Sequence, residues 1–176
     1  MKIILLLIPV SLLCACSGEE EVQTPVNNID WSQDNSSDMN QVFNSEEEDE
    51  IDLFVKRHAD WNVTETGTGL RYFVYEKSKN SDTAKVGDIA IVDFEVSLLD
   101  GTICYSSAET GPESFIVEHA DIESGLHEAI QLLCTGDKAK FILPSRMAHG
   151  LLGDEEKIPP LTTVVYDIHL LKIERP

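Results

Sequence analysis

Residues 85–107, KVGDIAIVDFEVSLLDGTICYSS, decide the fold class that this sequence predicts. Apolar side chains occupy every second position in the middle of the stretch, at Ala90, Val92, Phe94 and Val96. This period of two is typical of a β-strand with one buried face. The Asp100-Gly101 pair that follows is a strong signal for a hairpin turn, and residues 102–105 return as the partner strand. The stretch therefore predicts an antiparallel hairpin within a larger sheet.

The same alternation recurs on both sides of this hairpin. It appears at residues 70–75, 115–117, 139–143 and 164–170. Between Ser124 and Leu133 the spacing becomes helical, with one apolar stripe and Ser124 as the expected N-cap. About five strands and one short helix thus fill residues 66–174. The pattern predicts an α+β domain in which one face of an antiparallel sheet packs on a single helix.

A short amphipathic helix is expected before this domain. Residues 45–48 read Ser-Glu-Glu-Glu, which is the pattern of a capping box, and Ile51, Phe54 and Val55 follow at helical spacing. We therefore predict a helix at about residues 46–60, within a spacer at 45–65.

The segment at residues 16–44 is predicted to be a disordered acidic tether. Between residues 17 and 50 the chain has eleven Asp and Glu and no Lys or Arg, and the formal net charge of the whole chain is −19. Like charges repel one another and keep such a run extended. The same excess of negative charge argues against nucleic acid or an anionic membrane surface as a partner.

The first residues have the pattern of an export signal. Lys2 is followed by an apolar run at residues 3–13, which is too short to span a bilayer, and then by Ala15 and Cys16. This end is similar to the lipobox of bacterial lipoproteins. We therefore predict a lipoprotein signal peptide at residues 1–15 and lipidation of Cys16, with an ordinary cleaved signal as the alternative.

The sequence offers no pattern for covalent or metal-dependent catalysis. It has no G-x-S-x-G motif, and its five histidines are scattered without metal-ligand spacing. No cofactor or metal is expected. Cys104 and Cys134 lie outside the signal peptide and its lipobox; export permits a disulfide between them, but two cysteines do not imply one, and both are expected to be free thiols.

Four stretches follow one another in the order and spacing of a known family. They are residues 85–107, quoted above, 122–145 (IESGLHEAIQLLCTGDKAKFILPS), 148–153 (AHGLLG) and 158–173 (IPPLTTVVYDIHLLKI). Together they resemble the FKBP-type peptidyl-prolyl cis-trans isomerases. The resemblance implies that residues 66–176 form an isomerase domain, with a twisted antiparallel sheet wrapped on one short helix.

The full chain also resembles isomerase lipoproteins of gliding bacteria. This resemblance implies a place in the bacterial cell envelope, with the protein anchored to the outer membrane through Cys16. The acidic run CSGEEE at residues 16–21 is similar to surface-export signals of related lipoproteins, so the periplasmic and the surface-exposed location both stay open.

Prolyl isomerisation needs no nucleophile, metal or cofactor, because no bond is broken. The barrier to rotation is about 18–20 kcal/mol, since the planar amide is conjugated. A dry apolar cup favours the twisted and less polar amide, because it excludes the water that stabilises the planar form. The expected signature is a set of aromatic and apolar residues on several strands.

The resemblance places nine residues of this chain at positions of the isomerase pocket. They are Phe94, Tyr105, Phe115, Ile122, Glu123, Leu126, His149, Ile158 and Tyr166. It implies that the backbone N–H of Glu123 binds the substrate carbonyl, so that its side chain has little part. It also implies that His149 replaces a ligand-binding Tyr, and that the loop at residues 145–161 closes over the pocket. Plain core positions for the aromatic residues, and a plain loop position for His149, are the alternatives.

Three departures from the family pattern predict weak catalysis. Tyr105 stands where active members usually have Asp, and Cys104 and Glu113 stand where they usually have pocket aromatics. Each lost contact would cost one to two decades in rate if it mattered, which corresponds to roughly a few kcal/mol.

The sequence leaves three functions open. The first is a lipid-anchored isomerase that acts on proline-containing segments of exported proteins and assists their folding. The second is a catalytically weak chaperone or assembly factor with the same fold, and the third is a purely structural lipoprotein. The expected partners are the proline-containing segments and the lipid bilayer, without nucleic acid. The oligomeric state is left open, with a monomer as the simplest expectation.

Overall fold

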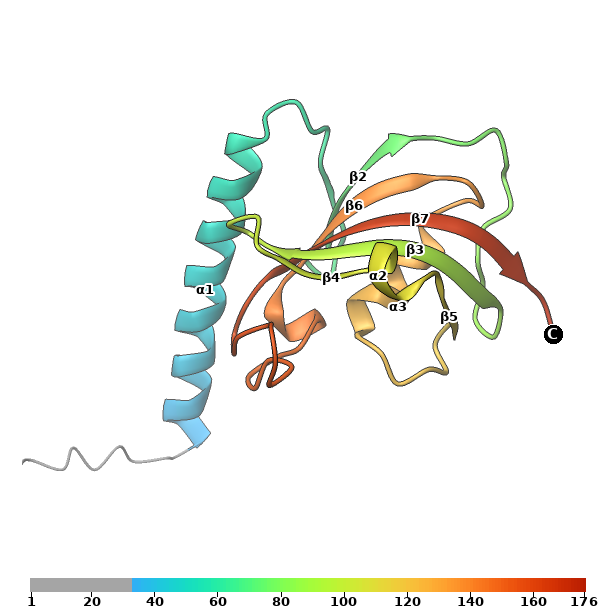
Figure 1. Ribbon diagram of the computed structural model, residues 1–176. Helices are drawn as coiled ribbons and strands as arrows, with labels where there is room; N and C mark the ends of the chain where they lie inside the picture. Colours follow the sequence, from blue (N-terminus) through green and yellow to red (C-terminus); the bar gives the residue numbers. More distant parts are fainter. Residues whose placement is uncertain (1–32) are drawn as a thin grey trace, which may run out of the picture.

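One antiparallel sheet carries the fold in the computed structural model, which describes residues 33–176 (Figure 1). Its seven strands are β1 (Thr64–Glu65), β2 (Arg71–Glu76), β3 (Ile89–Leu98), β4 (Ile103–Ser106), β5 (Glu113–Ile116), β6 (Lys138–Leu143) and β7 (Val164–Glu174). The helices are α1 (Gln33–Arg57), α2 (Ser107–Thr110), α3 (Ser124–Gln131) and the 3₁₀ turn η1 (Ser145–Met147). The predicted signal peptide, the predicted lipidation site at Cys16 and residues 16–32 of the predicted tether lie outside the described residues.

The strand order is β1-β2-β6-β7-β3-β4, with β5 also paired to β3. β3 pairs with β7 along its whole length, from Ile89 opposite Glu174 to Leu98 opposite Val164. On its other edge β3 pairs first with β5 and then with β4. The predicted β3–β4 hairpin is therefore present, and the α+β fold prediction is confirmed. The sheet has seven strands rather than about five, because strands as short as β1 show no alternation.

The two faces of the sheet are covered by different helices, as the burial of successive residues shows. On β6, Phe141 packs into the main core with α3, whereas the next residue, Ile142, packs against α1. On β7, Val164 and Val165 divide in the same way. Since neighbouring side chains of a strand point to opposite faces, α3 and α1 lie on opposite sides of the central strands.

Helix α3 is short, and its apolar side closes one face of the sheet. The main core includes its apolar stripe, with Leu126, Ala129 and Ile130 all buried. The expected N-cap at Ser124 is wrong. The cap residue is Glu123, which has an extended backbone at φ −59° and ψ 134° and makes no side-chain cap hydrogen bond. Its carboxylate is engaged elsewhere, as described below.

Helix α1 begins earlier than the sequence indicates. It starts at Gln33, so residues 33–44 are helical and not a disordered tether, and the capping pattern at residues 45–48 lies inside the helix. Within residues 33–44 only Gln33, Met39 and Gln41 are good helix formers, and each Asn, Ser or Asp there costs about 0.5 kcal/mol relative to Ala, so the local composition does not predict this part of the helix. The helix ends at Arg57, short of the predicted spacer end at residue 65, and β1 follows. Within residues 33–176, no helix is both long and apolar enough to cross a membrane.

Candidate functional site

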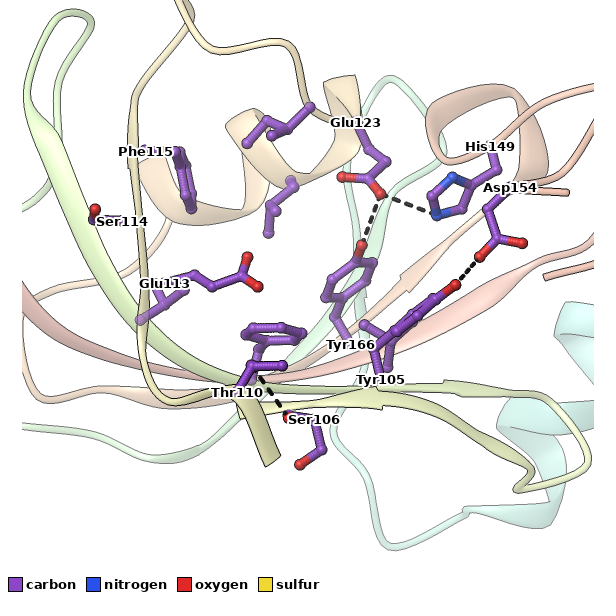
Figure 2. A pocket seen from close by; sticks show the side chains of 15 residues that line it. Tyr105, Ser106, Thr110, Glu113, Ser114, Phe115, Glu123, His149, Asp154 and Tyr166 are labelled. Carbon is purple, nitrogen blue, oxygen red and sulfur yellow. Dashed lines mark hydrogen bonds and ion pairs between the residues drawn. The ribbon is translucent and has the colours of Figure 1, made fainter. Parts of the chain in front are cut away.

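A cavity of about 370 Å³ opens between α3, the β3–β4–β5 edge of the sheet and the loop after β6 (Figure 2). We call this loop, residues 145–163, the flap. The cavity is lined by Val92, Phe94, Val96, Tyr105, Ser106, Thr110, Glu113, Ser114, Phe115, Ile122, Glu123, Leu126, His149, Asp154 and Tyr166. Eight of the nine residues that the resemblance places at the pocket are in this set.

One part of the cavity lining is apolar and aromatic. Phe94 comes from β3, Phe115 from β5, Leu126 from α3 and Tyr166 from β7, so four separate elements meet here. All four belong to the main core or pack against it. The packed sheet behind them fixes their positions, so the cup is formed before any ligand arrives.

His127 holds the wall next to Phe115 in place. Its ring lies 6.0 Å from the Phe115 ring in an edge-to-face arrangement. Its Nδ1 accepts a hydrogen bond of 3.0 Å from the backbone N–H of Glu118, and its Nε2 donates to the carbonyl of Ala120 at 3.1 Å. Because both ring nitrogens are used inside the protein, His127 supports the pocket and does not contact a ligand.

The polar side of the cavity is organised by the Glu123 carboxylate (Figure 2). Glu123 Oε1 accepts a hydrogen bond from the Tyr166 hydroxyl at 3.0 Å and lies 3.0 Å from His149 Nε2. Burial raises the pKa of Tyr166, and the negative charge of Glu123 raises it further, so this hydroxyl stays protonated as a donor. The Glu123 side chain thus joins the start of α3 to β7 and the flap, whereas its expected small part in substrate binding stays a prediction.

A second carboxylate reaches the cavity from the flap. The Tyr105 hydroxyl of β4 donates a hydrogen bond to Asp154 Oδ2, and the other oxygen of Asp154 accepts from the backbone N–H groups of Glu156, Lys157 and Ile158. The hydrogen bond to Asp154 raises the pKa of Tyr105 to about 12. Burial alone would raise the pKa of Asp154, but the four hydrogen bonds that it accepts lower it to about 2.

The Tyr105–Asp154 pair changes the meaning of one departure from the family pattern. The sequence has Tyr105 where a carboxylate is usual, and the Tyr105 hydroxyl binds a carboxylate of the flap, that of Asp154, which also lines the cavity. Sequence reasoning did not single out Asp154 as a site residue. The available signal was its position ahead of residues 155–158, since Asp often accepts hydrogen bonds from the backbone of a following turn.

Glycines and one lysine give the flap its fixed shape. Gly150 and Gly153 adopt φ of 62° and 69°, a region that favours glycine, and a Cβ on Gly153 would collide with the backbone of Ile158. Lys157 Nζ donates to the carbonyl of Cys104 at 2.7 Å and lies 4.8 Å from the centre of the Tyr105 ring. The flap is therefore attached to β4 at its far side.

The two other departures have different consequences. Glu113 lines the cavity, and Figure 2 shows its carboxylate turned toward the interior. Within residues 33–176 it has no hydrogen-bond or ion-pair partner. Cys104 is only 2% exposed and does not line the cavity; burial raises the pKa of its thiol. Cys104 and Cys134 are both free, as expected.

Ile158 is the predicted pocket residue that the structure does not bring to the cavity wall. Although it is a residue of the flap, it is 2% exposed and its side chain belongs to the main core. Its backbone N–H donates to Asp154 Oδ1 at 2.7 Å, so it supports the pocket indirectly. The roles of the other eight residues in binding or catalysis stay predictions. In the described part of the chain, no group of three or more His, Cys, Asp or Glu is placed to hold a metal ion.

Comparisons with known proteins agree with this geometry. The family model of FKBP-type peptidyl-prolyl cis-trans isomerases matches residues 80–171, just over half of the chain. The FKBP-type peptidyl-prolyl cis-trans isomerase FkpA of Aeromonas hydrophila is 38% identical over 115 residues, which cover 65% of this chain and 41% of that protein. The peptidyl-prolyl cis-trans isomerase FKBP2 of Bos taurus is 33% identical over 119 residues, which cover 64% of this chain and 85% of that one.

The fold of this chain is also similar to that of a solved structure. The crystal structure of FkpA from Escherichia coli matches 80% of this chain and 65% of that one, with a TM-score of 0.66 and 27% sequence identity. The chain spans less than half the length of the Aeromonas protein.

Proposed function

Because this chain belongs to the family of FKBP-type peptidyl-prolyl cis-trans isomerases, we propose that it catalyses rotation about X–Pro bonds in exported proteins. The observation that carries this proposal is the preformed cup of Phe94, Phe115, Leu126 and Tyr166, closed on one side by hydrogen-bonded polar groups. A proline ring fits such a cup, and the cup excludes water from the amide that must twist.

The chemistry follows from the loss of amide conjugation in the transition state. The twisted amide is less polar than the planar one, so an apolar and water-free wall favours the transition state over the ground state. The Tyr166 hydroxyl and the Glu123 carboxylate keep their partners inside the protein, so they do not leave an unpaired charge beside the proline ring.

Substrate orientation is assigned to the start of α3. The backbone N–H of Glu123 has no acceptor within residues 33–176, and it is available to a substrate carbonyl. His149 has a different part from the one that the resemblance implies. Its Nε2 faces Glu123 at 3.0 Å, so it holds the carboxylate and the flap edge together and is not free to donate that hydrogen to a ligand.

A catalytically weak peptide-binding module is the second candidate function. Glu113 favours this second function. Its carboxylate is turned toward the cavity interior, so it makes the cavity more polar and weakens the preference of the cavity for a twisted amide. The same residue does not prevent an extended peptide from binding.

The membrane anchor and the envelope location rest on the sequence of residues 1–16. An export signal that ends in a lipobox-like Cys16 supports a lipid anchor, with α1 between that anchor and the isomerase domain. Metabolic labelling of the full chain with a palmitate analogue tests the anchor. Label is expected on the wild-type chain and absent from Cys16→Ser; equal labelling of both would contradict the assignment.

A refolding assay tests whether this protein catalyses X–Pro isomerisation in a folding protein chain. A substrate protein whose slow refolding phase reflects X–Pro isomerisation should refold faster when catalytic amounts of this protein are added. Acceleration that requires stoichiometric amounts would favour the peptide-binding module. No effect on the slow phase at either ratio would count against both functions.

A further inference from the structure

Glu47 of α1 is a buried acid that does not line the cavity. It is 8% exposed, and its carboxylate accepts three hydrogen bonds. Oε1 accepts from the Ser145 backbone N–H at 2.6 Å and from the Thr163 hydroxyl at 2.6 Å, and Oε2 accepts from the Ser145 hydroxyl at 3.0 Å. Ser145 and Thr163 are themselves 4% and 3% exposed. The whole group is therefore shielded from water, where such bonds are strong and costly to lose.

The donors stand at the two ends of the flap. Ser145 is its first residue, directly after β6 and Pro144, and Thr163 is its last, directly before β7. One carboxylate thus closes the base of the whole loop. The neighbouring acid, Glu48, adds a second contact, since its Oε1 accepts a hydrogen bond of 3.2 Å from Nη2 of Arg146.

A short path of hydrogen bonds joins this base to the cavity. The carbonyl of Ser145 accepts from the backbone N–H of Ala148 at 3.0 Å and from that of Gly150 at 2.7 Å. These two peptide groups flank His149, whose ring reaches Glu123 at the pocket. The position of Ser145 therefore fixes the backbone that presents His149.

We propose that Glu47 is a positioning residue for the isomerase site: it holds the base of the flap, and through Ser145 it sets the place of His149 against Glu123. In this account α1 is part of the scaffold of the site and not only a spacer. The inference rests on the proposed isomerase activity, but its structural part can be tested without that activity.

Apolar contacts, and not Glu47, attach α1 to the sheet. The role of Glu47 can therefore be tested separately from the attachment of the helix. Ile51 and Phe54 of α1 pack on Ile142 and Val165 in a small apolar cluster of their own. These contacts supply the burial that attaches the helix, whereas burying a carboxylate is costly unless every oxygen is paired. The paired Glu47 carboxylate therefore sets the position of the flap base and adds little to the attachment of α1.

The test compares Glu47→Ala with Ile51→Ala, which weakens α1 docking without touching the flap. Both variants are expected to lower Tm, and both are assayed well below their Tm values. Glu47→Ala should lower kcat/KM for a proline peptide by about tenfold, because a site group displaced by about 1 Å costs up to a hundredfold. Ile51→Ala should leave kcat/KM within about twofold of wild type. Glu47→Gln should restore most of the loss, since its amide can accept two of the hydrogen bonds and donate the third.

A second measurement separates this inference from the proposed function. In ¹⁵N-labelled protein, the His149 ring signals should shift in Glu47→Ala and keep their wild-type positions in Ile51→Ala, whether or not the protein is an isomerase. Thr163→Val, which removes a single donor, replaces Glu47→Ala if the latter does not fold, with Thr163→Ser as its control. Equal losses of kcat/KM in the Glu47 and Ile51 variants, or unchanged His149 signals when the carboxylate contact is removed, would overturn the proposal.

Discussion

At the scale of single residues, the carboxylates around the cavity have separate tasks. Glu123 is paired with Tyr166 and His149, and Asp154 is paired with Tyr105 and three backbone N–H groups. Only Glu113 faces the cavity without a partner among the described residues. An unpaired carboxylate in a binding site attracts a cationic group, whereas a paired one mainly fixes geometry.

Glu113 should therefore influence which peptides bind. We expect a peptide with Lys next to proline to bind about two- to fivefold more tightly than its acetyl-lysine counterpart, since an exposed charge pair contributes at most about 1 kcal/mol. Glu113→Gln should abolish this preference, and so should high salt. Titration calorimetry at two salt concentrations measures it. Glu109→Gln, on α2 but outside the cavity lining, is the matched control; a preference that survives in Glu113→Gln would show that Glu113 does not select charge.

Asp154 should make the free energy of unfolding depend on pH. Its pKa is about 2 in the folded protein, below the ordinary value of 3.8, so folding favours its ionised form. That stabilisation is present above about pH 4 and is lost as pH falls toward 2. Urea unfolding of the wild type and of Asp154→Asn should show a free-energy difference that shrinks as the pH falls from about 4 toward 2. Parallel curves would contradict this, and Glu155→Gln, an exposed neighbour, serves as the control.

At the scale of elements, α1 is attached to the sheet by a few large side chains. Phe54 is 7% exposed, packs with Ile51, Ile142 and Val165, and meets the Trp61 ring edge-on at 5.7 Å between ring centres. Phe54→Ala should lower the free energy of unfolding by about 3 kcal/mol, because it removes this buried ring and leaves a cavity. Urea denaturation measures the loss. An unchanged stability would mean that α1 is a free spacer; Leu53→Ala, exposed on the same helix, should change little.

The elements that sequence reasoning found share one property, a pattern carried by neighbouring residues. The β3–β4 hairpin, the apolar stripe of α3 and the alternation of β7 are all local, and all are present in the structure. The start of α1 was missed because residues 33–44 have no apolar period and are rich in Asn, Ser and Asp, which are weak helix formers. β7 was recognised, but the burial of Val165 on its second face depends on α1, which local alternation does not reveal.

The candidate site was also predicted only in part: the positions of its residues were predicted, but their contacts were not. Eight of nine pocket positions followed from the resemblance, since a family motif fixes where a residue stands on the sheet. The motif did not reveal what the side chains touch. The contact of Glu123 with His149, and that of Tyr105 with Asp154, join residues from different parts of the chain. Such contacts depend on the conformation of the flap, and no local spacing predicts them.

At the scale of the whole molecule, the sheet separates two helices with different tasks. α3 closes the face that bears the cavity, and α1 covers the opposite face and holds the base of the flap through Glu47 (Figure 1). α1 is also the first described element after Cys16, the proposed site of the lipid anchor.

The central claim is that the cavity catalyses X–Pro rotation, and one measurement tests it most directly. NMR exchange spectroscopy gives the cis–trans rate of a proline peptide without a coupled protease, for the wild type and for Phe94→Ala, which opens the apolar cup. We predict exchange well above the uncatalysed rate in the wild type, and at least a tenfold lower kcat/KM in Phe94→Ala, because a lost wall contact costs about one to two decades. A wild-type rate equal to that of the peptide alone would contradict the account.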